Sequence, residues 1–272
     1  FKRDRREMAA WVASFHPELV VMESTGIYWK SPYAALEWYG LNLAVVNARH
    51  VKQVPGRKTD INDAQWLAIL ARSGLLRGGF VPPQHFRDYR LIARQLQKLT
   101  GIAAGEKTRL HKLLTDAGIR LSVVISDLSG KSAKAMIQGL LDGETPEQLV
   151  AHADPRLKAT PDELREALAG ELSDSHRFVI RELMAHLDEL EARIGRFRQT
   201  LLSHLSDYQG ILQNLQTIPG IDELSAAMLL VEIGDDMSAF GSADKLASWA
   251  GVCPGQNESA GKRKSARTRK GN

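Results

Sequence analysis

Two carboxylates three residues apart stand out in the stretch 58–64. Asp60 and Asp63 precede residues 64–72, whose pattern predicts a helix. Residues at i and i+3 share one helical face, so both carboxylates can point at one spot. Converging carboxylates repel each other unless a cation lies between them, and Mg²⁺ or Mn²⁺ prefers such oxygen ligands. The alternative is an ordinary helix start, because acidic residues in a first turn interact favourably with the helix dipole.

A third acid, Glu23, ends the short apolar run 18–23, which predicts a buried strand of a parallel sheet. Residues 41–47 predict a second strand, and helices are expected over 4–15 and 28–39. This alternation is typical of an α/β domain. Open α/β sheets bind ligands at the carboxyl ends of their strands, so Glu23 can join Asp60 and Asp63 in a metal site. Alternatively, the N-terminus of the helix 28–39 holds Glu23. Two strands make a thin layer, so we expect further strands upstream.

The segment 49–59 connects the second strand to the acidic pair and is rich in cations. These side chains could offset the repulsion among the three carboxylates, or they could grip the phosphates of a nucleic acid brought to the metal. The candidate nucleic-acid contacts in this segment are Arg49, Lys52, Arg57 and Lys58.

Two long helices are predicted over 88–117 and 175–205. In the second, apolar residues from Ile180 to Leu201 alternate at spacings of three and four, which predicts a coiled-coil seam. The pattern leaves open whether the two helices pair within one chain or between subunits. Short helices with turns are expected over 118–174. We interpret the histidines of this region as surface or packing residues, because they lack convergent metal-ligand spacing.

Towards the C-terminus, Pro219 and Gly220 separate two helical patterns, and the second covers 224–233. Such a turn resembles a helix-hairpin-helix, whose amides bind DNA phosphate. Asp222 stands where that motif usually has a second glycine, so it would either repel phosphate or cap the helix. A further short helix is predicted over 240–251, with Trp249 as its core anchor.

Ser259 follows in a turn of small residues and precedes a run of cations. Neighbouring cations or a metal could stabilise its alkoxide and the charge on an attacked phosphate, although an ordinary loop serine is the alternative. The whole chain carries a net charge of +4, whereas residues 259–272 contain six cations and no acid. A cluster on a nearly neutral body favours binding to a phosphate backbone. The six are Lys262, Arg263, Lys264, Arg267, Arg269 and Lys270.

The composition indicates which class of protein the chain belongs to. The chain has 272 residues, of which 43% are hydrophobic and 25% charged, as expected for a globular protein of about two domains. Its one cysteine, Cys253, excludes an internal disulfide and fits a reducing compartment. No apolar run approaches the roughly 20 residues of a membrane helix.

Six stretches together resemble a known family: VMESTGIYWKSPYAALE, VVNARHVKQVPGRKTDINDAQWLA, LLRGGFVPP, TIPGI, LASWAGVCPGQNESAGKRKS and TRKGN. The chain is similar along nearly its whole length to the DEDD insertion-sequence transposases, the serine-containing, bridge-RNA-guided recombinases with a RuvC-like domain. The resemblance implies a partial RNase H-like (RuvC-like) domain over 1–85, a helical coiled-coil region over 86–205, and a C-terminal transposase domain over 206–272. The expected fold class is therefore α/β plus all-α.

The resemblance also implies site residues and partners. Glu23, Asp60 and Asp63 match three of the family's four Mg²⁺-binding acids, and Ser259 matches its nucleophile, with Ser265 as the alternative. The family's first acid and first strands have no counterpart after Phe1, so we expect both ends to be cut from a longer protein and this chain to be weak or inactive alone. Expected partners are donor and target DNA, a guide RNA and further copies of the chain, in the bacterial cytoplasm with the nucleoid.

The sequence therefore predicts a transposase that cuts and rejoins DNA through a serine–DNA phosphodiester link, assisted by Mg²⁺ or Mn²⁺. Two alternatives remain. In a RuvC-like metal-dependent nuclease, the acids would activate water and Ser259 would be incidental. In a non-catalytic nucleic-acid-binding remnant, neither the acids nor Ser259 would take part in a reaction.

Overall fold

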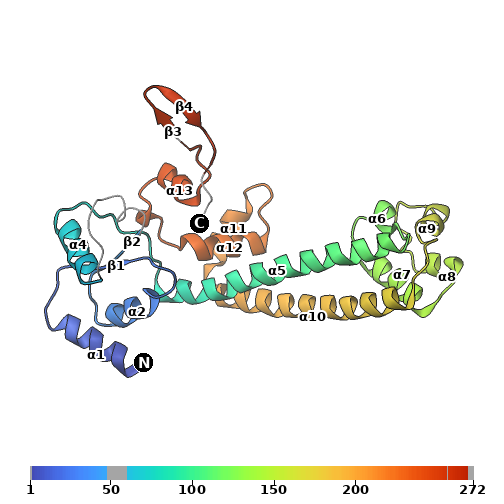
Figure 1. Cartoon of the computed structure of the whole chain (residues 1–272), viewed down its shortest axis with the longest axis horizontal. Coiled ribbons are helices and arrows are strands. Elements are labelled where there is room, and N and C mark those ends of the chain that lie inside the picture. The colour runs from blue at the N-terminus through green and yellow to red at the C-terminus, as the bar shows by residue number, and fades with distance from the viewer. Residues whose placement is uncertain (1, 48–59, 256, 269–272) are drawn as a thin grey trace. The chain divides into compact units, whose positions relative to one another are not determined.

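The computed structural model describes residues 2–47, 60–255 and 257–268 (Figure 1). The chain divides into two compact units, one formed by Phe1–Arg87 with Ile233–Asn272 and the other by Asp88–Glu232. Most of the described residues are helical and a small parallel sheet lies in the first unit, so the predicted mixture of α/β and helical structure is confirmed at this level. None of the described helices is both long and apolar enough to cross a membrane.

The first unit is built around a two-stranded parallel sheet. Strand β1 (Val20–Glu23) pairs with β2 (Leu43–Val46) in a register that sets Glu23 beside Val46. Parallel strands need a crossover, and the helix between them supplies it. The helices among the described residues of this part are α1 (Lys2–Ala13), α2 (Lys30–Trp38) and α4 (Asp60–Arg72). Helix α1 packs on α2, and α4 packs on β1. The buried residues of this layer are Ala9, Leu36, Val45, Val46 and Leu70.

After α4 the chain returns to the sheet and meets the C-terminal segment. Gly78 forms an antiparallel bridge with Val46, and two residues later Phe80 packs on Phe240 with 5.0 Å between ring centroids. Trp249 completes this aromatic cluster, 5.3 Å from Phe240. Trp249 was predicted to be a core anchor; it contacts the rings of Phe80 and Phe240 but is only half-buried. Its helix, α13 (Ala243–Ala250), starts later than expected because Ser242 caps it through the backbone N–H of Lys245. A short 3-10 turn, η2 (Met237–Ala239), precedes it.

The second unit is organised by two long antiparallel helices, α5 (Gln84–Asp116) and α10 (Asp174–His204) (Figure 1). The start of α5 lies beside the end of α10, where Tyr89 stacks on His204. The end of α5 lies beside the start of α10, where Asp116 accepts a hydrogen bond from His176. Both predicted helices are confirmed, and they pair within the chain. The seam residues Leu99, Ala103 and Leu190 are buried together.

Four short helices close the far end of this pair, as predicted. They are α6 (Leu121–Val124), α7 (Lys131–Asp142), α8 (Pro146–Ala151) and α9 (Pro161–Ala167). Helices α8, α9 and α10 each begin with a capping box, in which Thr145, Thr160 and Ser173 accept from the backbone three residues later. The core beneath them includes Leu114, Met136, Ile137, Leu164 and Ile180, all at most 1% exposed.

The remaining helices are η1 (Ser206–Tyr208), α11 (Gln209–Gln216) and α12 (Glu223–Ile233). Arg90 on α5 donates to the carbonyl oxygens of Val231 and Glu232 at the end of α12, and Arg94 binds both carboxylate oxygens of Glu232 at 3.0 Å. The last carbonyls of a helix lack partners within the helix, so this clamp satisfies them.

Candidate active site

Glu23 lies at the carboxyl end of β1, where the sequence placed it. The Thr25 hydroxyl donates to Glu23 Oε1 at 2.8 Å, and the amide of Ser24 continues the ladder by donating to the Val46 carbonyl at 2.9 Å. The side chain is half-buried. One carboxylate oxygen is thus oriented by the turn that follows the strand, so the group is held at the edge where α/β sheets bind ligands.

Asp60 and Asp63 both lie in the first turn of α4, which begins at Asp60 and therefore four residues earlier than the predicted helix. Asp63 is exposed, whereas the Asp60 side chain lies outside the described part of the structure. Because α4 packs on β1, the helix that carries the pair lies against the strand that carries Glu23. Among the side chains that are described, no group of three or more His, Cys, Asp or Glu is placed to hold a metal ion. The three-acid site stays a prediction.

The cations of the 49–59 segment also stay a prediction, because Arg49, Lys52, Arg57 and Lys58 lie outside the described residues. At the other end of the chain, Lys262 and Arg267 are exposed. The side chains of Arg263, Lys264, Arg269 and Lys270 are not among those described.

Ser259 ends a strand that sequence reasoning did not predict. Strands β3 (Asn257–Ser259) and β4 (Lys262–Ser265) form an antiparallel hairpin in which Ser259 pairs with Lys262. The two turn residues, Ala260 and Gly261, have φ angles of 51° and 73°, the left-handed values that a tight two-residue hairpin needs. The register therefore sets a lysine directly opposite the candidate nucleophile.

The base of this hairpin depends on a close backbone contact. A Cβ atom at Gly255 would lie 2.3 Å from the carbonyl oxygen of Arg267. Ser265, the alternative nucleophile, accepts a hydrogen bond from the Arg267 amide at 3.1 Å and so takes part in the turn that follows β4. Gly255 is required where the two ends of the hairpin meet, since any side chain there would separate them.

The Pro219–Gly220 turn favours packing over phosphate binding. Asp222 Oδ1 accepts from the backbone N–H of Ser225 at 2.7 Å, so Asp222 caps α12, which is one of the two predicted outcomes. Hydrogen bonds from Ser225, first its side chain and then its backbone, lower the pKa of Asp222. An ionised carboxylate at the turn repels phosphate.

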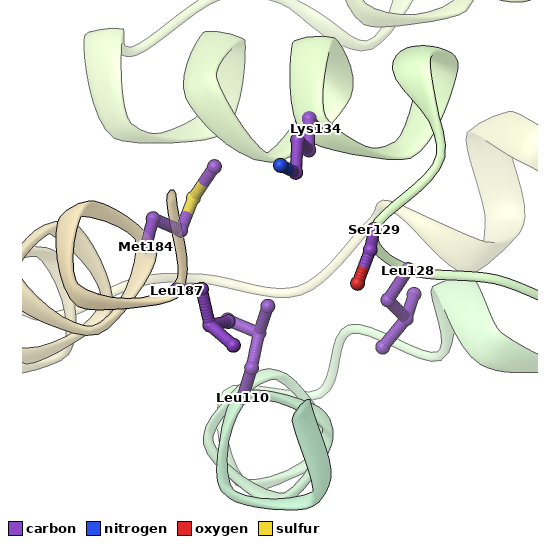
Figure 2. Close-up of a pocket in the computed structure, with 6 residues that line it drawn as sticks. All are labelled: Leu110, Leu128, Ser129, Lys134, Met184 and Leu187. Carbon is purple, nitrogen blue, oxygen red and sulfur yellow. The ribbon is translucent and has the colours of Figure 1, made fainter. Parts of the chain in front are cut away.

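A small pocket in the second unit is not a ligand site (Figure 2). It lies between α5, α7 and α10 and has room for roughly one water molecule. Lys134, the charged residue on its wall, already binds Asp188 at 2.7 Å and Glu191 at 2.8 Å. The apolar lining, which includes Leu110, Met184 and Leu187, belongs to the packing of the helical pair.

Sequence reasoning missed Thr25 as a residue that orients Glu23. The signal was present in the run Glu23-Ser24-Thr25-Gly26, because a hydroxyl two residues after an acid at a strand end can turn back to the carboxylate. The described candidate groups of the first unit thus come from two separate segments of the chain, one with the acids and one with the serine hairpin.

Both segments match known families. Residues 2–119 match the model of a transposase of the DEDD IS110 type, and residues 212–272 match the model described as the Transposase IS116/IS110/IS902 family. No curated protein matched the chain. The first match contains Glu23, Asp60 and Asp63, and the second contains Ser259 and the cations after it. Since the two matches follow each other in order and together span more than half of its residues, the chain belongs to the IS110-type transposase family.

Proposed function

We propose that this transposase cuts and rejoins DNA through a covalent serine–DNA link, with Ser259 as the nucleophile. The observation that carries the proposal is the placement of Ser259 at a hairpin turn, opposite Lys262, in the segment that matches the second family model. The backbone register is what supports it, because the Ser259 side chain lies outside the described part of the structure. A cation near a serine hydroxyl favours the alkoxide and the extra negative charge that develops on an attacked phosphate.

The proposed reaction conserves phosphodiester bonds. Ser259 Oγ forms a bond to phosphorus, one phosphorus–oxygen ester bond of the DNA breaks, and the serine proton leaves to the surroundings. The released deoxyribose oxygen takes up a proton and becomes a free hydroxyl. A hydroxyl from a second DNA end then attacks the serine phosphodiester and restores Ser259. Each break is matched by a new bond, so rejoining needs no external energy source.

Glu23, Asp60 and Asp63 are the residues that would hold a divalent cation. Their carboxylates are the hard oxygen donors that Mg²⁺ or Mn²⁺ prefers, and Glu23 is already oriented by Thr25. Such a cation supplies charge neutralisation at a scissile phosphate. The α/β layer that presents Glu23 would then be part of a RuvC-like, RNase H-like domain, with the fourth acid contributed by a further strand.

Partners follow from the same proposal. At least two duplexes must be cut and exchanged, so we expect several copies of the chain to act together with donor and target DNA. A guide RNA would choose the sequence by base pairing while the protein grips backbone and shape. The expected setting is the bacterial nucleoid.

The role of the acids can be tested without the serine. In the full-length protein, Glu23→Gln and Asp63→Asn should each lower Mg²⁺-dependent DNA cleavage by roughly a hundredfold or more, because each removes a charge that faces the cation. Glu18→Gln is the matched control, since Glu18 is an exposed acid just before the same strand. Unchanged cleavage in the Glu23 and Asp63 variants, or an equal loss in the Glu18 variant, would contradict the metal site.

A further inference from the structure

The loop that follows Glu23 carries two exposed apolar side chains. Residues 24–29 connect the carboxyl end of β1 to the start of α2. Within this loop, Ile27 is 71% exposed and Tyr28 is 80% exposed. Single exposed apolar residues are ordinary on a protein surface. These two, however, lie in succession at the edge where an open α/β sheet receives its ligand.

The turn after β1 holds Tyr28 close to Glu23. The Thr25 hydroxyl donates to Glu23 Oε1 at 2.8 Å, and the Tyr28 amide donates to the Thr25 carbonyl oxygen at 3.3 Å. The Tyr28 ring lies along Gly26, because a Cβ atom at Gly26 would be 3.7 Å from Cδ2 and 3.8 Å from Cε2 of the ring. The same turn therefore orients the carboxylate and places the ring.

The Tyr28 ring is available to a ligand. Its side chain has no hydrogen bond and no ring contact among the described residues. The neighbouring Trp29, in contrast, packs edge-on against Tyr33 with 5.7 Å between ring centroids. Lys30 is exposed two residues after Tyr28 and forms no ion pair with a described carboxylate. A flat ring and a cation without an ion pair thus follow the candidate metal ligand.

We propose that Tyr28 stacks on a base of the DNA strand whose phosphate lies at the Glu23 edge, and that Lys30 contacts a phosphate of the same strand. The identity of this strand rests on the function proposed above. Moving a DNA end from one duplex to another separates base pairs, and an aromatic ring stabilises an unpaired base through stacking. Tyrosine suits this role because only two side-chain torsions need to be fixed.

The surroundings of the ring favour a base over a protein partner. A protein interface needs a larger apolar core, whereas a base needs one flat face. The exposed residues beside Ile27 and Tyr28 in the loop and at the start of α2 are small, polar or charged: Ser24, Thr25, Gly26 and Lys30. The strand is DNA and not RNA, because the acids at this edge would receive the strand that is cut.

Binding to donor DNA tests the ring. Full-length protein carrying Ser259→Ala is titrated into fluorescent donor DNA in EDTA, so that neither the serine nor a metal contributes. Tyr28→Ala and Tyr28→Leu should each weaken binding about tenfold, because neither side chain has a flat face, whereas Tyr28→Phe should stay within about twofold of the parent. The unfolding midpoint should be unchanged in all three variants, since the side chain is exposed.

Trp38→Ala is the matched control. Trp38 is an aromatic residue of the same unit and is 79% exposed, but it lies at the end of α2. A crossover helix returns the chain to the amino ends of the parallel strands, so Trp38 lies at the edge opposite Glu23. Its removal should leave DNA binding unchanged.

A cycle with abasic DNA identifies the stacked base. Donor DNA is prepared as a series in which one nucleotide at a time lacks its base. At the stacked position, removing the base should weaken binding to the parent about tenfold but leave binding to Tyr28→Ala unchanged, because the same contact cannot be lost twice. Lys30→Gln should lower the slope of log affinity against log salt by about one.

Three results would overturn the proposal: equal DNA binding by Tyr28→Ala and the parent, an equal loss in Trp38→Ala, or base removals that act identically on the parent and on Tyr28→Ala at every position. A loss of RNA hairpin binding in Tyr28→Ala with unchanged DNA binding would assign the ring to RNA and also refute it. The covalent adduct is measured separately, so Ser259 can fail as the nucleophile while Tyr28 succeeds, and the reverse.

Discussion

Single residues decide the geometry around Ser259. Gly255 admits the Arg267 carbonyl, and Ala260 with Gly261 forms the turn next to the serine. We expect Gly255→Ala to open the base of the hairpin and abolish most DNA reaction, because a 2.3 Å approach cannot accommodate a methyl group. Gly261→Ala is the comparison, since nothing lies within 4 Å of its Cβ and only the left-handed φ is strained, at a cost of about 1 kcal/mol.

Amide hydrogen exchange of β3 and β4 distinguishes the two variants. Gly255→Ala should lose the protection of the hairpin, while Gly261→Ala should keep part of it. Equal protection in both variants would show that the Gly255 contact does not hold the hairpin together.

Asp154 offers a residue-level test in the second unit. Arg156 donates to both carboxylate oxygens at 3.0 Å through its side chain and to Oδ1 at 2.9 Å through its backbone. These bonds, the side-chain ones first, lower the pKa of Asp154 to about 2 from 3.8. A carboxyl group whose pKa is depressed by folding contributes stability above its unfolded pKa, and this contribution is lost as pH falls through the folded pKa.

The pH dependence of thermal unfolding between about 4 and 2 should therefore be flatter in Asp154→Asn than in the parent protein. Arg156→Gln should flatten it in part, because it removes the side-chain hydrogen bonds and leaves the backbone donor in place. A full parental slope in both variants would contradict the assigned pKa shift.

At the scale of elements, the clamp between α5 and α12 is the most specific contact. Arg90 is 16% exposed and binds helix-end carbonyls, whereas the Arg94–Glu232 pair is 54% and 31% exposed. Truncating Arg90 to alanine should lower the free energy of unfolding by about 1–3 kcal/mol, because it leaves partly buried carbonyl oxygens without their donor. The Arg94→Gln and Glu232→Gln cycle should give a coupling of only about 0.5–1 kcal/mol, since solvent screens the pair.

Denaturant unfolding of the single and double variants measures both quantities. A coupling energy near zero would mean that the bidentate contact is not maintained in solution. If Arg90→Ala lowered the free energy of unfolding by less than Arg94→Gln does, Arg90 would not be the more stabilising of the two arginines.

The elements also show what a sequence can predict. The spacing from Ile180 to Leu201 predicted α10 and its seam, because a helical period is local information. The partner of the seam was undetermined, because the same apolar positions would fit a helix of another copy. The hairpin at Ser259 was missed, since strands of three and four residues that carry mostly polar and charged side chains lack the alternating pattern of a half-buried strand.

At the scale of the whole molecule, the acids and the serine come from segments more than a hundred residues apart in sequence, yet both segments belong to the unit formed by Phe1–Arg87 with Ile233–Asn272. The sequence predicted Trp249 as an anchor but not its partners, because Phe80 and Phe240 meet it through long-range packing that has no local signature. Glu23, Asp60, Asp63 and Ser259 stay predictions as site residues, because their mutual geometry depends on tertiary contacts that a local sequence pattern does not contain.

Covalent linkage of Ser259 to DNA can be tested by trapping a protein–DNA adduct. Full-length protein is incubated with donor and target DNA, RNA and Mg²⁺, then denatured and resolved for a protein–DNA adduct. We expect an adduct in the parent protein and in Ser265→Ala, and none in Ser259→Ala. An adduct that persists in Ser259→Ala, or cleavage that survives there without any adduct, would contradict Ser259 as the nucleophile. The second result would favour a metal-dependent nuclease.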